Sequence, residues 1–255
     1  MGNKIINGIE IMKYLRNWPI FFLDRLHLIR QNIVIYRFRN GVKLITRTGT
    51  CDRGLINAIW IEENYTRFPG FSVKDDDIIV DIGAHIGVFS IFAAVRAKNG
   101  RIYSYEPFLE NFRLLEKNIS MNSLSNINIF NLGVCGKERE RNLFVEKDTG
   151  GHNLYNNLNL GSREIRCTTI EGIFNSNNLD QINFLKIDCE GAEYEILFNT
   201  PKDVFKKIDK ISLEYHSSSS NLNTELKNFL RNMNFDIILI DKPTEHILYG
   251  KNKQF

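Results

Sequence analysis

Along most of this chain, apolar residues recur first at strand spacing and then at helix spacing, an order typical of an α/β protein. The strand patterns include uninterrupted runs such as Ile78-Ile79-Val80. Strands that are buried on both faces of a parallel sheet need such runs, so the sequence predicts a doubly wound, mostly parallel sheet. The expected strands cover residues 78–80, 101–106, 127–129, 182–188 and 208–216, and the expected helices include residues 87–96 and 109–121.

The N-terminal part of the chain carries a different pattern. Residues 9–29 predict two short helices on either side of Pro19. Residues 33–39 and 42–46 predict a β-hairpin, and Asn40-Gly41 between them favours a two-residue turn with positive φ angles. We therefore assign residues 1–70 to an N-terminal helical and β-hairpin extension, and residues 71–255 to the main domain.

Two further segments lie in the second half of the chain. The runs 235–240 and 247–249 flank Asp241-Lys242-Pro243-Thr244 and predict an antiparallel hairpin that closes the sheet. Residues 137–170 are rich in Asn and Gly and show no clear crossover pattern. We expect this insert to form a mobile loop that covers the binding crevice or contacts the acceptor.

The composition agrees with the predicted fold, and the distribution of charged residues along the chain is uneven. Apolar residues make up 43% of the 255 residues and charged residues 25%, which excludes disorder as the main state. The net charge is +3, but residues 1–53 contain 10 Lys and Arg against 3 Asp and Glu. This excess is compatible with an ordinary solvated surface, with an anionic acceptor or with peripheral membrane contact, and it does not indicate nucleic-acid binding. Neither a membrane-spanning stretch nor a signal-peptide pattern is visible, so we expect a cytoplasmic protein.

The four cysteines carry no recognisable chemistry in the sequence. They are far apart and form no CxxC pair, so we expect neither a zinc site nor a disulfide framework. Cys189 has no basic residue beside it to lower its pKa, which disfavours a nucleophile. The sequence thus predicts four small buried side chains at Cys51, Cys135, Cys167 and Cys189.

The strongest chemical signal is the turn between the first strand and the first helix of the main domain. Gly83 and Gly87 let the backbone turn tightly and approach a ligand, and Asp81 places a carboxylate at the strand end. Glu106 ends the next strand, where an acidic side chain accepts hydrogen bonds from ribose hydroxyls. The spacing predicts a cofactor that contains adenosine.

The same turn discriminates between cofactors. Dinucleotide-binding proteins use G-x-G-x-x-G to place a pyrophosphate at a helix N-terminus, whereas His85 stands here in place of the second glycine. Asp81 would repel a diphosphate but suits a ligand that carries a sulfonium group. S-adenosylmethionine therefore fits better than NAD.

At these positions the sequence resembles the FkbM family of S-adenosylmethionine-dependent methyltransferases. The resemblance rests on residues 81–90, on Tyr105-Glu106-Pro107 with Asn111, and on residues 185–193, the most family-specific block. Asp52 and residues 62–65 extend it upstream, to roughly residues 40 to 220 in all. It implies a class I, Rossmann-like methyltransferase fold with a seven-stranded sheet.

The resemblance also assigns cofactor contacts. Methyltransferases of this fold often hold the adenine with an acidic residue after the third strand, where this chain has Asn131, so Asn131 or backbone groups must serve instead. Tyr65 can close over the cofactor or pack in the core, and His85 packs or contributes backbone to the glycine turn. The resemblance places Asp81, Gly83, Ala84 and Gly87 at the methionine portion and Glu106 at the ribose, with Pro107 and Asn111 in support.

Acidic and histidine side chains at later strand ends are the candidates for the acceptor side. We expect Asp188 to act as positioner or base, Glu190 as substrate contact and His216 as base or structural histidine. Glu193 is more simply a carboxylate in the first turn of a helix. No Asp-Pro-Pro-Tyr motif is present, so methylation of a nucleobase amino group is disfavoured.

The sequence therefore predicts transfer of a methyl group from S-adenosylmethionine to an oxygen, most simply a hydroxyl of a sugar, a glycan or a related metabolite. Two alternatives stay open: an NAD-binding oxidoreductase, and a cofactor-binding module that regulates a partner without catalysis. The acceptor, the oligomeric state and any need for a metal cannot be read from the sequence.

Overall fold

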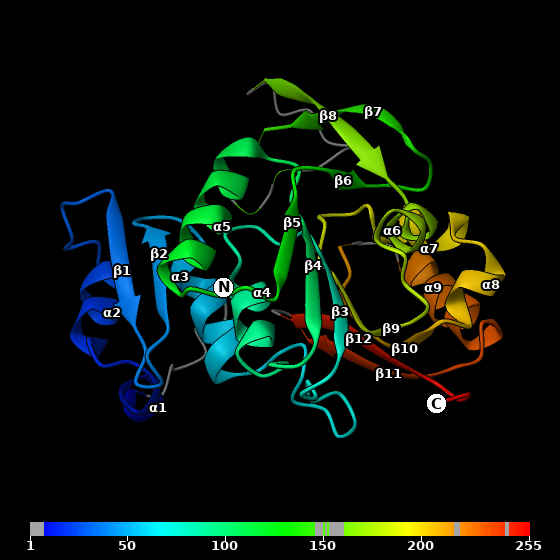
Figure 1. The fold of residues 1–255 in the computed structure, drawn as a ribbon. Coiled ribbons are helices and arrows are strands. Elements are labelled where there is room, and N and C mark those ends of the chain that lie inside the picture. The colour runs from blue at the N-terminus through cyan, green and yellow to red at the C-terminus, as the bar shows by residue number, and fades with distance from the viewer. Residues whose placement is uncertain (1–7, 146–149, 151, 153–160, 217–219, 243–244) are drawn as a thin grey trace.

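In the part of the chain that the computed structural model describes, seven strands form one twisted sheet between two layers of helices (Figure 1). The described residues are 8–145, 150, 152, 161–216, 220–242 and 245–255. The strands lie in the order β11 (Phe235–Lys242), β12 (Glu245–Asn252), β10 (Ile208–Glu214), β9 (Ile182–Ile187), β3 (Ile78–Ile82), β4 (Arg101–Tyr105) and β5 (Ile127–Phe130).

The strand directions confirm the doubly wound, mostly parallel sheet. Five neighbouring strands are parallel to one another: β10, β9, β3, β4 and β5. β12 runs antiparallel to its two neighbours, β10 and β11. The chain moves outward from β3 to β5 and then returns to β9 on the other side of β3. Ligands of such sheets bind beyond the carboxyl ends of the strands at this switch point.

The apolar strands serve two cores because successive side chains point to opposite faces. Ile79 and Phe184 belong to one buried cluster, and Val80 and Leu185 belong to the other. The first face is covered by α4 (Val88–Ala94) and α5 (Leu109–Met121), and the second by α6 (Ile170–Asn177), α7 (Glu193–Asn199), α8 (Lys202–Phe205) and α9 (Ser220–Asn232) (Figure 1).

The N-terminal part packs on the first face. The two expected helices and the hairpin are present, followed by two helical segments that the sequence did not predict. Trp60 is buried here, with its ring centroid 4.4 Å from that of Phe38 and 5.3 Å from that of Phe92. The elements are α1 (Gly8–Tyr14), α2 (Trp18–Arg25), β1 (Ile33–Arg37), β2 (Lys43–Arg47), α3 (Asp52–Ile56) and the π-helix η1 (Asn57–Ile61).

The hairpin turn differs from the prediction. The N–H of Phe38 donates to Val42 O (2.8 Å) and that of Gly41 to Phe38 O (3.2 Å), so three residues form the loop. Only Gly41 has a positive φ, of 95°, whereas a two-residue turn of the expected type requires positive φ at both central positions. The prediction of a two-residue turn is therefore wrong: Asn40 keeps its ordinary conformation and Gly41 alone makes the reversal.

The insert was expected to be a loop, but it contains two strands, β7 and β8, that join β6 in a second, three-stranded sheet. β6 (Gly133–Val134), β8 (Ser162–Thr168) and β7 (Arg139–Phe144) lie in that order, with β7 antiparallel to β8. Few side chains of β7 and β8 are buried, among them Leu143, Ile165 and Cys167. The sequence therefore contains no apolar run that would predict these two strands. The residues between β7 and β8 lie outside the described part, apart from residues 145, 150, 152 and 161.

Two further predictions concern the cysteines and membrane-spanning helices. The Sγ atoms of Cys135, which follows β6, and of Cys167 in β8 lie 2.7 Å apart, a contact that their spacing in sequence did not indicate. None of the helices in the described part combines the length and the apolar character needed to cross a bilayer.

Candidate active site

A cavity of about 300 Å³ opens at the carboxyl ends of β3, β4, β9 and β10, where the switch point predicts a ligand. Residues from every block of the resemblance meet there. Nine of the predicted site residues line it among the described residues: Gly83, Ala84, His85, Glu106, Pro107, Asn111, Asp188, Glu190 and His216. Tyr65, Asp81, Gly87 and Asn131 stand behind this lining and contact it.

Two glycines shape the turn between β3 and α4. Gly83 has φ of 75°, and a Cβ atom there would lie 1.7 Å from the carbonyl oxygen of Asp188. Gly87 has φ of 86°, and its Cβ would lie 2.4 Å from a methyl carbon of Leu115. Any side chain would therefore push the turn away from β9 and from α5, and the backbone could not form this wall of the cavity.

Glu106 is held at the end of β4 by backbone groups. One carboxylate oxygen accepts the N–H of His85 (2.8 Å) and the other accepts the N–H of Phe108 (2.9 Å). Burial raises the pKa of Glu106 to about 7, against the opposing effect of these hydrogen bonds. Asn131 donates to the carbonyl oxygens of Glu106 (2.9 Å) and Pro107 (3.0 Å), so it fixes the course of this segment.

Lys186 is a buried cation that the sequence analysis assigned no role. Its Nζ lies 3.1 Å from a carboxylate oxygen of Asp81 and 3.7 Å from one of Asp188, and it donates to Gly83 O at 2.8 Å. Burial alone would lower the pKa of Lys186, but the two carboxylates outweigh burial and raise it, so the lysine stays charged. Asp81 also accepts a hydrogen bond from Ser90 (2.6 Å) and is fully buried, so it acts on the cavity through Lys186.

Tyr65 reaches the cavity wall from the N-terminal part of the chain. Its hydroxyl lies within hydrogen-bond distance of Asp188 (2.9 Å) and Glu214 (3.1 Å). The hydroxyl has one hydrogen, so it donates to one carboxylate at a time. Burial, and then the charges of Asp188 and Glu214, raise the pKa of Tyr65 well above its usual value, so the phenol stays protonated.

The two carboxylates beside Tyr65 have different proton affinities. Burial tends to raise the pKa of Asp188, but the charges of Lys186 and His216 outweigh it, and the pKa is lowered. Burial, with the charge of Asp188, raises the pKa of Glu214 to about 7. At neutral pH, Asp188 is therefore the ionised partner and Glu214 the one that can take up or release a proton.

His216 faces three carboxylates. Its Nδ1 lies 2.9 Å from Glu193, and its Nε2 lies 3.7 Å from Glu190 and 3.9 Å from Asp188. Burial alone would lower the pKa of His216, but the hydrogen bond to Glu193 and the surrounding negative charge raise it to about 10. Such a histidine holds its proton at neutral pH, so it is suited to donate hydrogen bonds.

Glu190 and Glu193 occupy the segment between β9 and α7. Glu190 has φ of 52°, and burial raises its pKa to about 7. Glu193 begins α7, as expected of a carboxylate in the first turn of a helix, but it is fully buried and also accepts the backbone N–H of Cys189 (3.1 Å). It is therefore the residue that orients His216.

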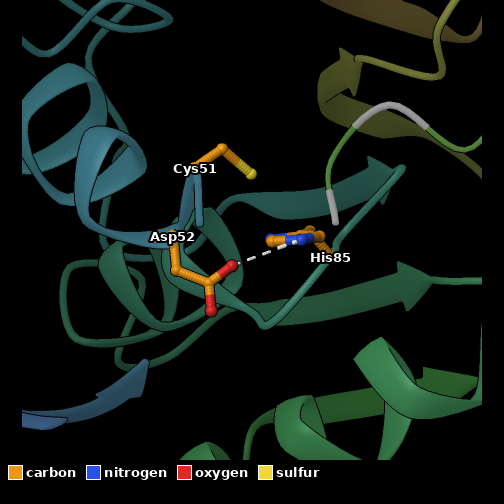
Figure 2. Close-up of side chains that lie close together, drawn as sticks. All are labelled: Cys51, Asp52 and His85. Carbon is orange, nitrogen blue, oxygen red and sulfur yellow. Dashed lines mark ion pairs between the residues drawn. The ribbon is translucent and has the colours of Figure 1, made fainter. Parts of the chain in front are cut away.

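Two groups of possible metal ligands occur among the described residues, although no spacing in the sequence required a metal. One consists of Asp188, Glu214 and His216. The other consists of Cys51, Asp52 and His85, at one side of the cavity, where Asp52 lies 3.6 Å from His85 (Figure 2).

Basic or hydrogen-bonding side chains of the protein already contact both groups of possible metal ligands. Arg47 forms two hydrogen bonds with Asp52 (2.9 and 3.0 Å), and its guanidinium also lies 3.2 Å from His85. Lys186 and the hydroxyl of Tyr65 face Asp188. Protein side chains thus already contact Asp52, His85 and Asp188 at the positions where a metal ion would bind.

Three cavity residues were missed in the sequence or given no role there. Lys186 had a signal, since a lysine inside an otherwise apolar strand needs a buried partner. Glu214 also ends a strand, but nothing in the sequence separated it from other carboxylates. His152, whose ring centroid lies 4.0 Å from that of Phe108, comes from the insert and carried no sequence signal.

The strand order, the glycine turn and the buried acid at the end of the second parallel strand together define a class I, Rossmann-like methyltransferase. Comparison with known proteins agrees with this class. The model of the FkbM methyltransferase domain matches residues 81–237. The chain therefore belongs to the FkbM methyltransferase family.

Individual relatives are distant. Over 196 residues the chain is 26% identical to the AMB antimetabolite synthetase AmbE of Pseudomonas aeruginosa, a match that covers 62% of this chain and 9% of the synthetase. It is 23% identical over 206 residues to Methyltransferase 1 of Beauveria bassiana, covering 72% of this chain and 81% of that protein. The solved structure of an FkbM methyltransferase from Methylobacillus flagellatus is 20% identical, with a TM-score of 0.53, and the match covers 78% of this chain and 53% of that one. The chain thus spans a small part of the synthetase and about half of the solved structure, and the latter likeness shows the fold.

Proposed function

We propose that this methyltransferase uses S-adenosylmethionine to methylate a hydroxyl group of a sugar, a glycan or a related metabolite. The observation that carries the proposal is the proton-sharing group formed by Asp188, Tyr65 and Glu214 at the cavity wall. A hydroxyl must lose its proton as it attacks a methyl group, and a base with a pKa close to neutral serves that step best.

The cavity fits the proposed cofactor by charge and shape. Asp188, Glu190 and Glu214 all line it, so a sulfonium would find compensating charge, whereas the pyrophosphate of NAD would be repelled. The absence of a side chain at Gly83 lets the turn lie against the backbone of Asp188, so that both residues line the cavity. Glu106 keeps lone pairs for ribose hydroxyls beyond its two backbone hydrogen bonds.

In this proposal the chain supplies positioning and proton removal. S-adenosylmethionine would contribute an electrophilic methyl group on a positively charged sulfur. Asp188, ionised and anchored by Lys186, orients the acceptor hydroxyl, and Glu214 receives its proton. His216, held by Glu193, donates a hydrogen bond to the acceptor, and Glu190 contacts the same molecule.

Calorimetric titration of the purified protein with S-adenosylmethionine, S-adenosylhomocysteine and NAD tests the cofactor. We expect micromolar binding of the two adenosyl compounds and none of NAD. Binding of NAD alone would contradict the proposal and favour an oxidoreductase.

A radiolabelled methyl-transfer screen tests the acceptor class, with sugars and glycosides set against amines. We expect label in hydroxyl compounds only. Asp188→Asn should lower turnover more than cofactor affinity, because Asp188 acts on the acceptor. Cofactor binding without transfer to any hydroxyl would support a non-catalytic module instead.

A further inference from the structure

Exposed apolar side chains are concentrated in one stretch of the chain. Among the described residues, eight large apolar side chains are exposed, and six of them lie between residues 9 and 33. α1, α2 and β1, which carry or adjoin them, form the outer edge of the N-terminal part, at the side of the molecule away from β9 and β10 (Figure 1). We call this set the N-terminal patch: Ile9, Met12, Leu23, Leu26, Leu28 and Ile33.

The most prominent part of the patch follows α2. Leu26 and Leu28 are 64% and 63% exposed, on either side of His27, which has a positive φ of 55°. This conformation turns the chain sharply and leaves both leucines on its outside. Arg25 and Arg30 flank the two leucines in sequence.

The part of the chain that carries the patch has uncompensated positive charge. Each acidic residue of the first 53 has a basic partner in the same part of the chain: Glu10 with Lys13 (2.6 Å), Asp24 with Arg53 (3.7 Å) and Asp52 with Arg47 (2.9 Å). The other described basic residues there form no ion pair with a described carboxylate. These are Arg16, Arg25, Arg30, Arg37, Arg39 and Lys43.

We propose that the N-terminal patch docks on the surface of an anionic lipid bilayer. Exposed leucines next to arginines match such a surface, because the apolar groups enter the boundary between headgroups and acyl chains while the arginines meet lipid phosphates. A second copy of the chain fits less well, since self-association would bring two sets of six unpaired cations together. The proposal concerns a surface outside the cavity and stands independently of the proposed function.

Sedimentation of the full chain with vesicles tests this proposal. We expect binding to vesicles that contain phosphatidylglycerol, little binding to phosphatidylcholine alone, and weaker binding as the salt concentration rises. Replacing Arg25→Gln together with Arg30→Gln should weaken binding on the order of 10- to 30-fold, because two cations near the anionic surface are lost. Leu26→Ser with Leu28→Ser should weaken it at least about tenfold through loss of apolar insertion.

Phe255→Ser is the matched control, since Phe255 is 52% exposed and lies outside the patch. It should bind vesicles like the unaltered chain. All altered side chains are exposed or half-buried, and the unfolding temperature of each variant verifies that it is folded. Equal binding to neutral vesicles, absence of vesicle binding, or light scattering that shows dimers abolished by the leucine changes would each overturn the proposal.

Discussion

Replacing Lys186 by methionine tests what holds the cavity wall in place. Methionine keeps most of the length and apolar stem of the lysine but removes the charge that lies between Asp81 and Asp188. It also removes the hydrogen bond to Gly83 O, which connects β9 to the glycine turn. Lys186→Met should therefore affect both stability and cofactor binding.

The expected loss of stability in Lys186→Met follows from the burial of the ion pair between Lys186 and Asp81. At the observed 3.1 Å between Lys186 and Asp81, Coulomb's law with an effective dielectric constant of about 20 gives an attraction of roughly 5 kcal/mol. Desolvation offsets much of this in the intact pair, but removing one partner leaves the fully buried Asp81 without its counter-charge. Loss of one partner of a buried pair costs about 3–5 kcal/mol, which corresponds to a decrease in unfolding temperature of roughly 10 °C.

Urea unfolding measures this free energy, and calorimetry measures the affinity for S-adenosylmethionine. Lys210→Met is a matched control, because Lys210 is equally buried and lies 3.1 Å from Asp77, away from the cavity. Both variants should lose stability, whereas only Lys186→Met should lose cofactor affinity. Adding Asp81→Asn to Lys186→Met should restore at least about 1 kcal/mol, because it removes the unpaired charge.

Two results would refute this reasoning. A free energy of unfolding within about 0.5 kcal/mol of the unaltered chain would show that the ion pairs do not hold the turn. An equal loss of cofactor affinity in Lys186→Met and Lys210→Met would show a general effect of stability rather than a local one.

Three further predictions concern the cavity. Glu214→Gln should reduce the rate of methyl transfer about 10²- to 10⁴-fold. It should also abolish the roughly tenfold rise in rate that a base with a pKa of about 7 produces between pH 6 and pH 8. A pH–rate profile with the same rise in the variant would exclude Glu214 as the base. Glu106→Ala should weaken S-adenosylmethionine binding by about 1.5–3 kcal/mol, and unchanged affinity in calorimetry would remove Glu106 from the cofactor site. Folding raises the pKa of His216 from 6.5 to about 10, so the stabilisation by the protonated ring is complete below pH 6.5 and is lost as the pH rises through 10. The stability difference between the unaltered chain and His216→Gln in urea unfolding should accordingly shrink over that interval, and a constant difference would argue against the charged histidine.

Much of the fold could be predicted because the relevant signals are local. The apolar runs that became β3, β9 and β10 serve two cores at once, so their composition alone indicated parallel strands. Helix α5 was predicted to its terminal residues because its apolar positions repeat along one face. The small sheet of the insert was not predicted, because β7 and β8 bury few side chains and their largely polar sequence is typical of a loop.

The candidate site was predicted in part for the same reason. Gly83 and Glu106 were found because a glycine turn after a strand, and an acid after the next strand, have fixed spacings. Glu214 and His152 had no such spacing. Tyr65 was named, but its contact with Asp188 joins residues 123 positions apart in sequence.

The sequence by itself determined where the main strands of the domain lie along the chain, that the sheet is mostly parallel, and the chemical types of side chain at the ends of those strands. These follow from periodicity and from short spacings, which act through neighbouring residues. Only the tertiary structure decided how protons and charges are distributed among Asp188, Glu214 and His216. The pKa of each group depends on its burial and on charges contributed by other elements, such as Lys186 and Glu193, and these quantities exist only once the chain has folded.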